Sequence, residues 1–399
     1  MTVRTIAVAG CGPAGLAAAL LLARDGHRVT LFERFATPQP IGSGLMLQPT
    51  GLAVMQELGL TEAVLARGAR VDRLLGCTAK GSVVLDVAYR ALKGERFGLG
   101  IHRASLFGVL FDAAIAAAIP IETGRTVIGS EPASDDGRRL LFEDGTRSVR
   151  FDLVVDALGS RTPLAPPTGR ELAYGALWTS LAWPEGSALS PSTLEQRYHR
   201  ASQMVGVLPT GKRASGGGAE ASLFWSLRLD RLEAWRAAGL AAWKAEVQAL
   251  WPATEPLLAR IDHPDQLAVA RYAHRTLSHP AGHGMIHIGD AWHSASPQLG
   301  QGANMALLDA FALRQGLRGA ATMEAGLART VALRRRHVGL YQALTALLTP
   351  VYQSDSRVIP ASRDRLVAPL SRLPLVERIQ AALVAGLVGR PLAKLALHA

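Results

Sequence analysis

The chain has 399 residues, of which 49% are apolar and 19% are charged, and this composition is typical of a compact globular protein with two or three domains. Its net charge of +11 comes mainly from scattered arginines, without the long basic run or interleaved aromatic residues of a nucleic-acid surface. Two cysteines are too few for a disulfide framework, and no run approaches the roughly 20 apolar residues that span a bilayer. We therefore expect a cytoplasmic protein that binds no nucleic acid.

The N-terminal segment carries a dinucleotide-binding pattern. An apolar strand predicted over 5–9 leads into the turn Gly10-Cys-Gly-Pro-Ala-Gly15, a helix over 16–24, and a strand over 28–32 that ends at an acid. In such a unit the glycines permit a tight turn, close approach to a pyrophosphate and helix packing, and the acid accepts from ribose hydroxyls. The residues predicted to bind the nucleotide are Gly10, Gly12, Pro13, Ala14, Gly15, Glu33 and Arg34.

The middle of the chain alternates between helical and strand patterns. From about residue 171 to 273 aromatic residues cluster and strands predominate, as in a substrate-binding domain, and the helix in this region has an apolar side that suits packing on a sheet. In chain order we predict helices over 51–58 and 61–67, a hairpin within 70–88, a helix over 103–118, a strand meander over 126–156 and a helix over 231–251.

A second pattern stands near residue 290. A buried strand predicted over 285–288 ends at Gly289, Asp290 follows, and a glycine-rich loop leads to a helix over 303–315. An acid beside a helix N-terminus can hold a polyol and also face an anion. FAD needs both, because it has a ribityl chain and a ring that becomes anionic at N1 on reduction. The cofactor contacts predicted here are Gly289, Asp290, Pro297, Gly300, Gly302, Ala303 and Asn304.

Together the two patterns resemble the class A FAD-dependent monooxygenases typified by para-hydroxybenzoate hydroxylase. The loop 42–49 resembles that family's mobile loop along the flavin ring, and 101–106 resembles the start of its third FAD-domain helix. Residues 153–161 resemble its Asp-Gly motif, although Ala157 replaces the usual glycine. The resemblance implies further cofactor contacts from Gly44, Arg103, Asp156, Gly159 and Arg161.

The resemblance also implies the fold. We expect an α/β protein in which a Rossmann-type FAD-binding domain is interleaved with a mainly β substrate domain and followed by C-terminal helices. The expected parts are 1–72, 101–170 and 276–345 for the FAD-binding domain, 73–100 and 171–275 for the substrate domain, and 346–399 for the C-terminal helices.

The activity that the resemblance implies is hydroxylation. NADPH or NADH reduces FAD, O2 adds at C4a of the reduced ring, and the hydroperoxide passes oxygen to an apolar, aromatic or polycyclic molecule. The nicotinamide nucleotide binds transiently, because the chain has no second complete GxGxxG. Pro297, which lacks an N–H, is expected to wall the C4a pocket as a catalytic residue. The substrate is expected to contact Tyr198, Phe224 and Trp225.

Several alternatives stay open. His293 is either a general base or, as we favour, a residue that holds the turn beside the cofactor. The segment 375–397 is apolar on one side and could lie on a membrane, but its glycines and Pro391 favour docking on the protein. Arg334 to Arg336 are expected on a solvated face, and His283 and His287 are not spaced for a metal site.

The class of protein has alternatives as well. The tryptophans never form the Trp-x-Trp-x-Ile-Pro pattern of flavin-dependent halogenases. A flavoprotein reductase of isoprenoid double bonds shares both FAD motifs, and a non-enzymatic flavin-binding protein is a third possibility. The chain is expected to be a monomer or a homodimer.

Overall fold

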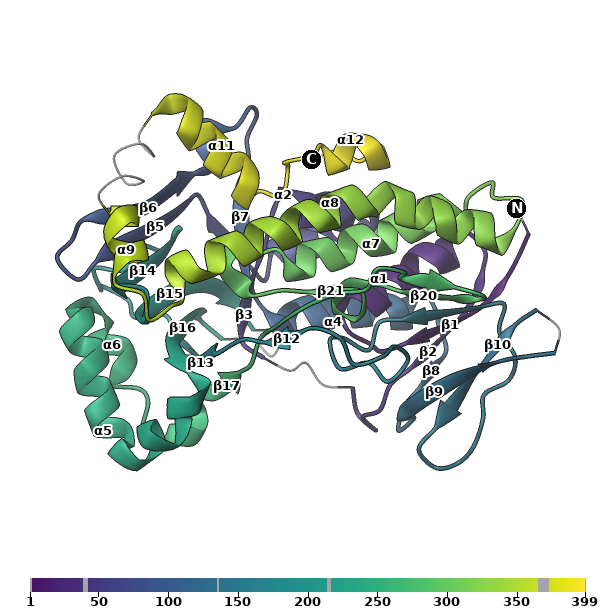
Figure 1. Cartoon of the computed structure of the whole chain (residues 1–399), viewed down its shortest axis with the longest axis horizontal. Coiled ribbons are helices and arrows are strands. Elements are labelled where there is room, and N and C mark those ends of the chain that lie inside the picture. The colour runs from purple at the N-terminus through teal and green to yellow at the C-terminus, as the bar shows by residue number, and fades with distance from the viewer. Residues whose placement is uncertain (1, 39–41, 135, 214–216, 365–372, 399) are drawn as a thin grey trace.

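The computed structural model describes residues 2–38, 42–134, 136–213, 217–364 and 373–398 (Figure 1). Its first large sheet has six strands in the order β19-β20-β11-β1-β2-β8. The strands from β20 to β8 are parallel, and β19 is an antiparallel edge strand. The strand bounds are β1 Thr5–Ala9, β2 Arg28–Phe32, β8 Ile121–Glu122, β11 Leu153–Asp156, β19 Ala281–Gly282 and β20 Met285–His287.

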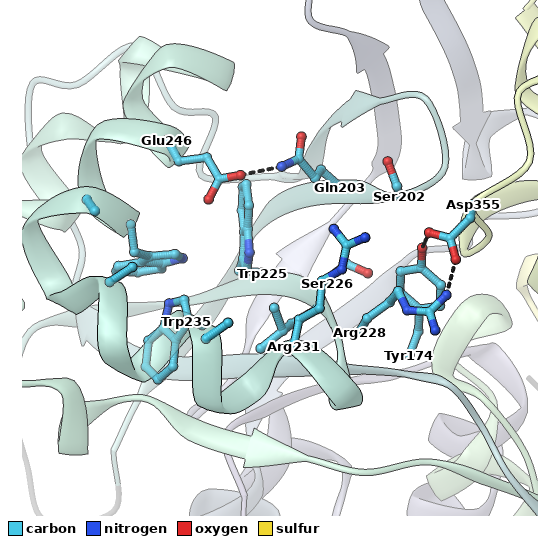
Figure 2. A pocket seen from close by; sticks show the side chains of 15 residues that line it. Tyr174, Ser202, Gln203, Trp225, Ser226, Arg228, Arg231, Trp235, Glu246 and Asp355 are labelled. Atoms are coloured by element: carbon cyan, nitrogen blue, oxygen red, sulfur yellow. Dashed lines mark hydrogen bonds and ion pairs between the residues drawn. The ribbon is translucent and has the colours of Figure 1, made fainter.

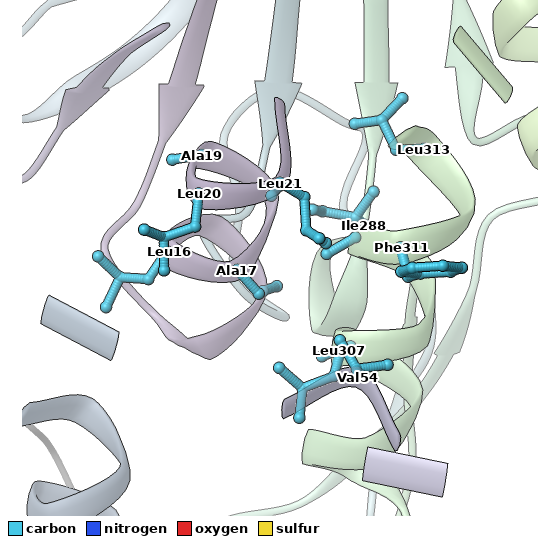
Figure 3. Close-up of a cluster of buried hydrophobic side chains, with 14 of the residues drawn as sticks. Leu16, Ala17, Ala19, Leu20, Leu21, Val54, Ile288, Leu307, Phe311 and Leu313 are labelled. Atoms are coloured by element: carbon cyan, nitrogen blue, oxygen red, sulfur yellow. The ribbon is translucent and has the colours of Figure 1, made fainter. Parts of the chain in front are cut away.

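Both faces of this sheet are covered, as a parallel sheet requires. In β1, Ile6 and Val8 face the helices α1 (Pro13–Arg24), α4 (Arg103–Ala116) and α7 (Gly302–Leu317), while Ala7 and Ala9 face the hairpin of β9 (Val127–Pro132) and β10 (Arg138–Phe142). Helix α1 is buried along most of its length because small and leucine side chains occupy all of its faces. Figure 3 shows it packed beside Ile288 and α7.

The second large sheet has seven strands in the order β17-β13-β16-β15-β14-β5-β6. One face is covered by α5 (Leu232–Leu250) and α6 (Glu255–Leu258), which form a separate apolar cluster with it. The predicted helix over 231–251 is therefore confirmed, with a kink at Gly239. The strand bounds are β5 Arg73–Thr78, β6 Val83–Ala88, β13 Tyr174–Ala182, β14 Thr193–His199, β15 Gln203–Lys212, β16 Ala219–Arg228 and β17 Ala268–Ala270.

Smaller elements join the two sheets. The three-stranded sheet β3-β7-β4 lies between them, and its strand β7 contacts β15 of the second sheet. A second small sheet has the order β12-β18-β21. The bounds are β3 Gly44–Leu47, β4 Ala69–Val71, β7 Gly98–His102, β12 Arg170–Glu171, β18 Ala273–Thr276, β21 His293–Ser294, α2 Pro49–Glu57 and α3 Thr61–Leu65.

The C-terminal helices dock on the rest of the protein. Helix α8 (Met323–Tyr352) runs along α7, and α9 (Val358–Ser362) follows it (Figure 1). Helix α11 (Pro374–Val384) contacts β6, while α12 (Pro391–Leu395) contacts α2, α7 and α8. Within the described residues, no helix is both long enough and apolar enough to cross a membrane.

Candidate functional site

The two sequence patterns meet in space at Gly289. This residue has a φ of +58°, and a Cβ placed on it would lie 3.1 Å from the Cβ of Ala14 and 3.1 Å from the Cβ of Ala306. Ala14 is in the first turn of α1 and Ala306 is in the second turn of α7. The N-terminal glycine turn and the motif near residue 290 therefore form one continuous surface.

The N-terminal turn is closed on one side and open on the other. A Cβ on Gly15 would lie 1.9 Å from the carbonyl oxygen of Gly10, and a Cβ on Gly10 would lie 2.6 Å from that of Ala157. At Gly12, by contrast, such an atom would meet nothing within 4 Å in the described part of the chain. Glu33 supports the turn by accepting from the Cys11 N–H at 3.1 Å. The open side at Gly12 leaves room for a ligand against the start of α1.

Asp290 lies in the short turn Gly289–Ala291 that follows β20. Its side chain is exposed, yet the surrounding protein desolvates it enough to raise its pKa, against the opposing charges of Arg103 and His293. Arg103 begins α4, and its N–H donates to the Ser43 carbonyl at 2.9 Å. An exposed carboxylate with protein around it fits a site that a polar ligand fills, so these residues suit the polyol and phosphates of FAD.

At the start of α7 the backbone N–H groups are not capped by the side chain at the N-cap. Gln301 at the N-cap makes no side-chain capping bond, and the first turn contains no acidic residue. Asn304, fully buried, donates to the Met46 carbonyl at 3.1 Å and the Gly300 carbonyl at 2.9 Å, and accepts from the Gln48 N–H at 2.8 Å. Its side chain thus joins β3 and the start of α2 to the turn before α7.

A buried carboxylate holds the Gly289 turn from behind. Asp309 in α7 accepts from the Gly289 N–H at 2.9 Å, pairs with His293 Nε2 at 2.7 Å and accepts from Arg334 Nε at 2.7 Å. Burial alone would raise the pKa of Asp309, but His293 and Arg334 lower it to about 2. Because His293 is bound to this anchor, the geometry favours its role in holding the turn over general base catalysis.

The prediction that Arg334 to Arg336 lie on a solvated face is wrong for Arg334. Arg335 and Arg336 are exposed as expected, but Arg334 is fully buried and bonds to Asp309 and to His337 Nδ1 at 2.7 Å. The buried positions of α8 recur every three or four residues and include Arg334, so helical periodicity places it on the inner face.

Asp156, which the sequence predicts as a cofactor contact, bonds to neighbouring protein groups in the structure. Asp156 is fully buried, and its carboxylate accepts from the Leu158 N–H at 3.0 Å and Thr162 Oγ1 at 2.7 Å and pairs with His287 Nδ1 at 2.6 Å. These bonds hold the segment after β11 in place. Gly159 and Arg161 in that segment are open, since a Cβ on Gly159 would meet nothing within 4 Å in the described chain and Arg161 is exposed.

Gly44 lies where β3 packs closely against β15 and β16 of the second large sheet. Its N–H donates to Ser222 Oγ at 2.9 Å, and a Cβ there would lie 2.5 Å from both Ser222 Oγ and Thr210 Cγ2. The other predicted cofactor residues lie on the open surface: Pro13 begins α1, Arg34 is exposed beside Phe35, and Pro297, Gly300, Gly302 and Ala303 line the turn and first residues of α7.

The two predicted aromatic residues of β16 point to opposite faces. Phe224 stacks on Trp178 with ring centroids 4.5 Å apart, on the same face as Ser222, which bonds to Gly44. Trp225 belongs to the cluster under α5 and lines a groove of about 270 Å³ on that far face (Figure 2). Trp225 and Phe224 therefore face different sides of the second sheet, and at most one of them can line a cavity on the side of Gly44. Tyr198 is buried, and its ring centroid lies 5.6 Å from that of Tyr352.

Sequence reasoning missed several residues around the site. Asp309, Gln301 and His337 are buried beside the two turns, and of these only His337 could have been found from the helical periodicity of α8. Tyr272 is half-buried and its hydroxyl accepts from Trp178 Nε1 at 3.0 Å, which brings it beside the Phe224 stack. Among the described residues no group of three or more His, Cys, Asp or Glu side chains could hold a metal ion.

Comparison with known proteins agrees with this geometry. A family model described as an FAD binding domain matches residues 3–336. The 6-methylpretetramide 4-monooxygenase of Streptomyces rimosus is 27% identical over 384 residues, which cover 92% of this chain and 89% of that protein.

Solved structures share the fold. A tetrameric form of 2-methyl-3-hydroxypyridine-5-carboxylic acid oxygenase has a TM-score of 0.77 at 20% identity, over 94% of this chain and 99% of that one. Klebsiella pneumoniae HpxO, in complex with FAD and uric acid, has a TM-score of 0.78 at 18% identity, over 96% of this chain and 97% of that one.

The match over most of the chain shows that this protein belongs to the family of FAD-binding-domain proteins, with the predicted α/β fold and with FAD as its cofactor. Within that family it is an FAD-dependent monooxygenase of the aromatic hydroxylase type.

Proposed function

We propose that this chain uses NADPH or NADH and O2 to place one oxygen atom on an aromatic or polycyclic small molecule. The observation that carries the proposal is the contact of Gly289 with Ala14 and Ala306, which forms one FAD site from two distant motifs. Bound FAD supplies the redox chemistry and the reaction with O2. The protein binds it, orients it and keeps water away.

The two ends of the cofactor have separate partners in this proposal. The N–H groups at the start of α1, beside the open Gly12, hold the diphosphate, and Glu33 accepts from the adenosine ribose. Asp290 accepts from the hydroxyls of the ribityl chain, and Arg103, which is close enough to lower the pKa of Asp290, pairs with phosphate or ribityl oxygens.

The flavin ring is proposed to lie against the start of α7. The N–H groups of Gly302, Ala303 and Asn304 face the negative charge that the ring carries when reduced, and the helix dipole adds to their effect. Pro297 is exposed beside this turn, and since it has no N–H it can wall the reacting edge without donating a hydrogen bond. His293 holds the turn through Asp309.

The substrate is proposed to lie on the Phe224 face of the second sheet. Trp178 and Tyr272 are half-buried there, which leaves part of each ring open to a ligand. Burial raises the pKa of Tyr272 to about 12, so its hydroxyl stays protonated and can donate to an oxygen or a ring nitrogen. Flat aromatic substrates suit this face, in line with the pyridine carboxylic acid and the uric acid of the structurally similar proteins.

The test is a flavin spectrum of the purified protein, followed by oxygen uptake with NADPH or NADH in the presence of hydroxybenzoates, hydroxypyridines and polycyclic phenols. We expect at least one compound to stimulate oxygen uptake and, under ¹⁸O2, to gain one ¹⁸O atom. A flavin-containing protein that oxidises NAD(P)H only with an alkene acceptor, and equally well without O2, would instead be a reductase of isoprenoid type. A protein that takes up no flavin would contradict both the monooxygenase and the reductase.

A further inference from the structure

The carboxyl end of α11 lies against the turn that precedes α7. The last carbonyl groups of a helix have no partners within that helix, and here side chains from other elements bind them. Leu383 accepts from Tyr341 Oη at 2.9 Å, Val384 accepts from Gln301 Nε2 at 2.6 Å, and Gly386 accepts from His337 Nε2 at 3.2 Å. The end of α11 is therefore held by specific polar contacts as well as by apolar packing.

Gln301 connects the end of α11 directly to the start of α7. It stands between Gly300 and Gly302 at the N-cap of α7, its side chain is buried, and its amide also donates to the Leu299 carbonyl at 3.3 Å. A Cβ on Gly386 would lie 2.8 Å from Gln301 Oε1 and 2.6 Å from Thr50 Oγ1. The C-terminal segment thus touches the turn whose N–H groups are proposed to face the flavin, and the fit requires a glycine at 386.

His337 connects the same segment to the other cofactor turn. Its Nε2 carries the proton that Gly386 accepts, so its Nδ1 accepts from Arg334. Arg334 in turn bonds to Asp309, which holds the Gly289 N–H. Both turns around the proposed flavin site are therefore tied, through buried side chains, to the residues after α11.

We propose that residues 383–386 form a positioning element for the flavin, which acts through Gln301 and fixes the N–H groups at the start of α7. This inference rests on the proposed place of FAD. Hydrogen-bond donors stabilise an anionic ring most strongly when they are already in position. Donors that must first move, or that also bind water, contribute less. Weakening the contact between residues 383–386 and Gln301 therefore makes the reduced, anionic flavin less stable relative to the oxidised flavin.

The experiment compares Gly386→Ala with Gly389→Ala in the FAD-loaded protein. Both glycines have a left-handed backbone, with φ of +78° and +83°, so alanine meets a similar backbone penalty at each. At Gly389, however, the nearest atoms to the new Cβ are 3.7 Å and 3.9 Å away, which is ordinary contact. The pair therefore separates the steric contact with Gln301 and Thr50 from general strain near the C-terminus.

The measurement is the midpoint potential of bound FAD. We expect Gly386→Ala to shift the ratio of reduced to oxidised flavin at least tenfold toward the oxidised form, about 30 mV for a two-electron couple. Gly389→Ala should keep the wild-type potential. Tyr341→Phe, which removes the hydroxyl that bonds to the Leu383 carbonyl, should shift the potential in the same direction by a smaller amount and serves if Gly386→Ala does not fold.

The outcomes separate the two proposals. Flavin-loaded variants whose potentials all equal that of the wild type would overturn the positioning element and leave the proposed function standing. A wild-type protein that takes up no FAD would overturn the proposed function, and the positioning element with it.

Discussion

Asp290 shows how a functional residue is placed at some cost to stability. Its pKa is raised by desolvation, so the folded protein without cofactor holds the charged carboxylate less well than the unfolded chain does. Such a group destabilises the fold at pH values above its ordinary pKa, and in the proposed function the hydroxyls of the cofactor donate hydrogen bonds to it. Asp152 is the opposite case: its side chain accepts from Thr5 and Arg150, and its pKa is lowered in spite of partial burial.

Replacing Asp290 tests this contrast. We expect Asp290→Asn to stabilise the flavin-free protein at pH 7 and to weaken FAD binding at least tenfold, because a charge-assisted hydrogen bond contributes about 1.5–3 kcal/mol. Asp152→Asn should lower the stability and leave the FAD affinity unchanged. The measurements are thermal unfolding of the flavin-free protein and titration with FAD. Wild-type FAD affinity in Asp290→Asn would rule out its contact with the cofactor.

His337 predicts a pH dependence of stability. Burial, and then the charge of Arg334, lower its pKa to about 3, with Asp309 and the Gly386 carbonyl acting in the other direction and His293 adding to the lowering. Since the unfolded histidine takes up a proton below about pH 6.5, the stability that neutral His337 provides is lost as the pH falls through that value.

The loss amounts to about 1.4 kcal/mol per pH unit, or about 2 kcal/mol between pH 6.5 and 5. Unfolding free energies of His337→Gln, which keeps a donor and an acceptor, should fall less steeply over this range than those of the wild type. Exposed His199→Gln is the control and should leave the slope unchanged. Equal slopes in His337→Gln and wild type would show that His337 is not held neutral.

At the scale of elements, the first turn of the β1-α1-β2 unit separates two uses of glycine. Gly15 has no room for a side chain, because a Cβ would overlap the Gly10 carbonyl, whereas Gly12 has space and a φ of −70°, which alanine adopts readily. The first position serves the packing of the fold, and the second serves the proposed ligand. Ala157 packs against this turn, with its Cβ 3.3 Å from the Cβ position of Gly15.

Two single substitutions should therefore behave differently. We expect Gly12→Ala to fold with a stability within about 1 kcal/mol of the wild type but to bind FAD at least tenfold more weakly. Gly15→Ala should lose both stability and FAD binding, because its Cβ meets backbone that cannot move aside. Thermal unfolding without flavin and FAD titration distinguish the two, and normal FAD binding by Gly12→Ala would place the diphosphate elsewhere.

At the scale of the whole molecule, the C-terminal segment is part of the core. Leu392, Leu395 and Leu397 are buried in the same apolar cluster as α1 and α7. The expectation that this segment docks on the protein is met at these residues. The outer side of α11 differs, because Leu375 and Ile379 are 71% and 56% exposed.

A pair of leucines tests this arrangement. Leu395→Ala should lower the free energy of unfolding by about 2–4 kcal/mol although it stands near the end of the chain, because it leaves a cavity where α12 packs on α2, α7 and α8. Leu375→Ala should change it by less than about 0.5 kcal/mol. Chemical denaturation measures both. A Leu395→Ala variant as stable as the wild type would mean that α12 is detached in solution.

Much of this protein could be predicted from local sequence. The glycine turn, Asp290 after its strand and the helix that became α7 are set by short-range rules of backbone geometry, and each was predicted where the structure has it. Alternation in β16 likewise separates Phe224 from Trp225. The alternation alone does not predict which face of β16 packs on Gly44 and which packs on α5, because that depends on elements far away in the chain.

The same limit explains the buried charges. Arg334 and Asp309 are 25 positions apart, and only the packing of α8 on α7 brings them to 2.7 Å. A charge in a sequence is most often solvated, so local reasoning placed Arg334 outside, although its helical position was already on the buried face. By itself the sequence determined which short segments carry the patterns of an FAD-binding domain. Tertiary structure decided which charges and carbonyls hold those segments in place, since such partners are chosen by packing between elements and not by neighbours in the chain.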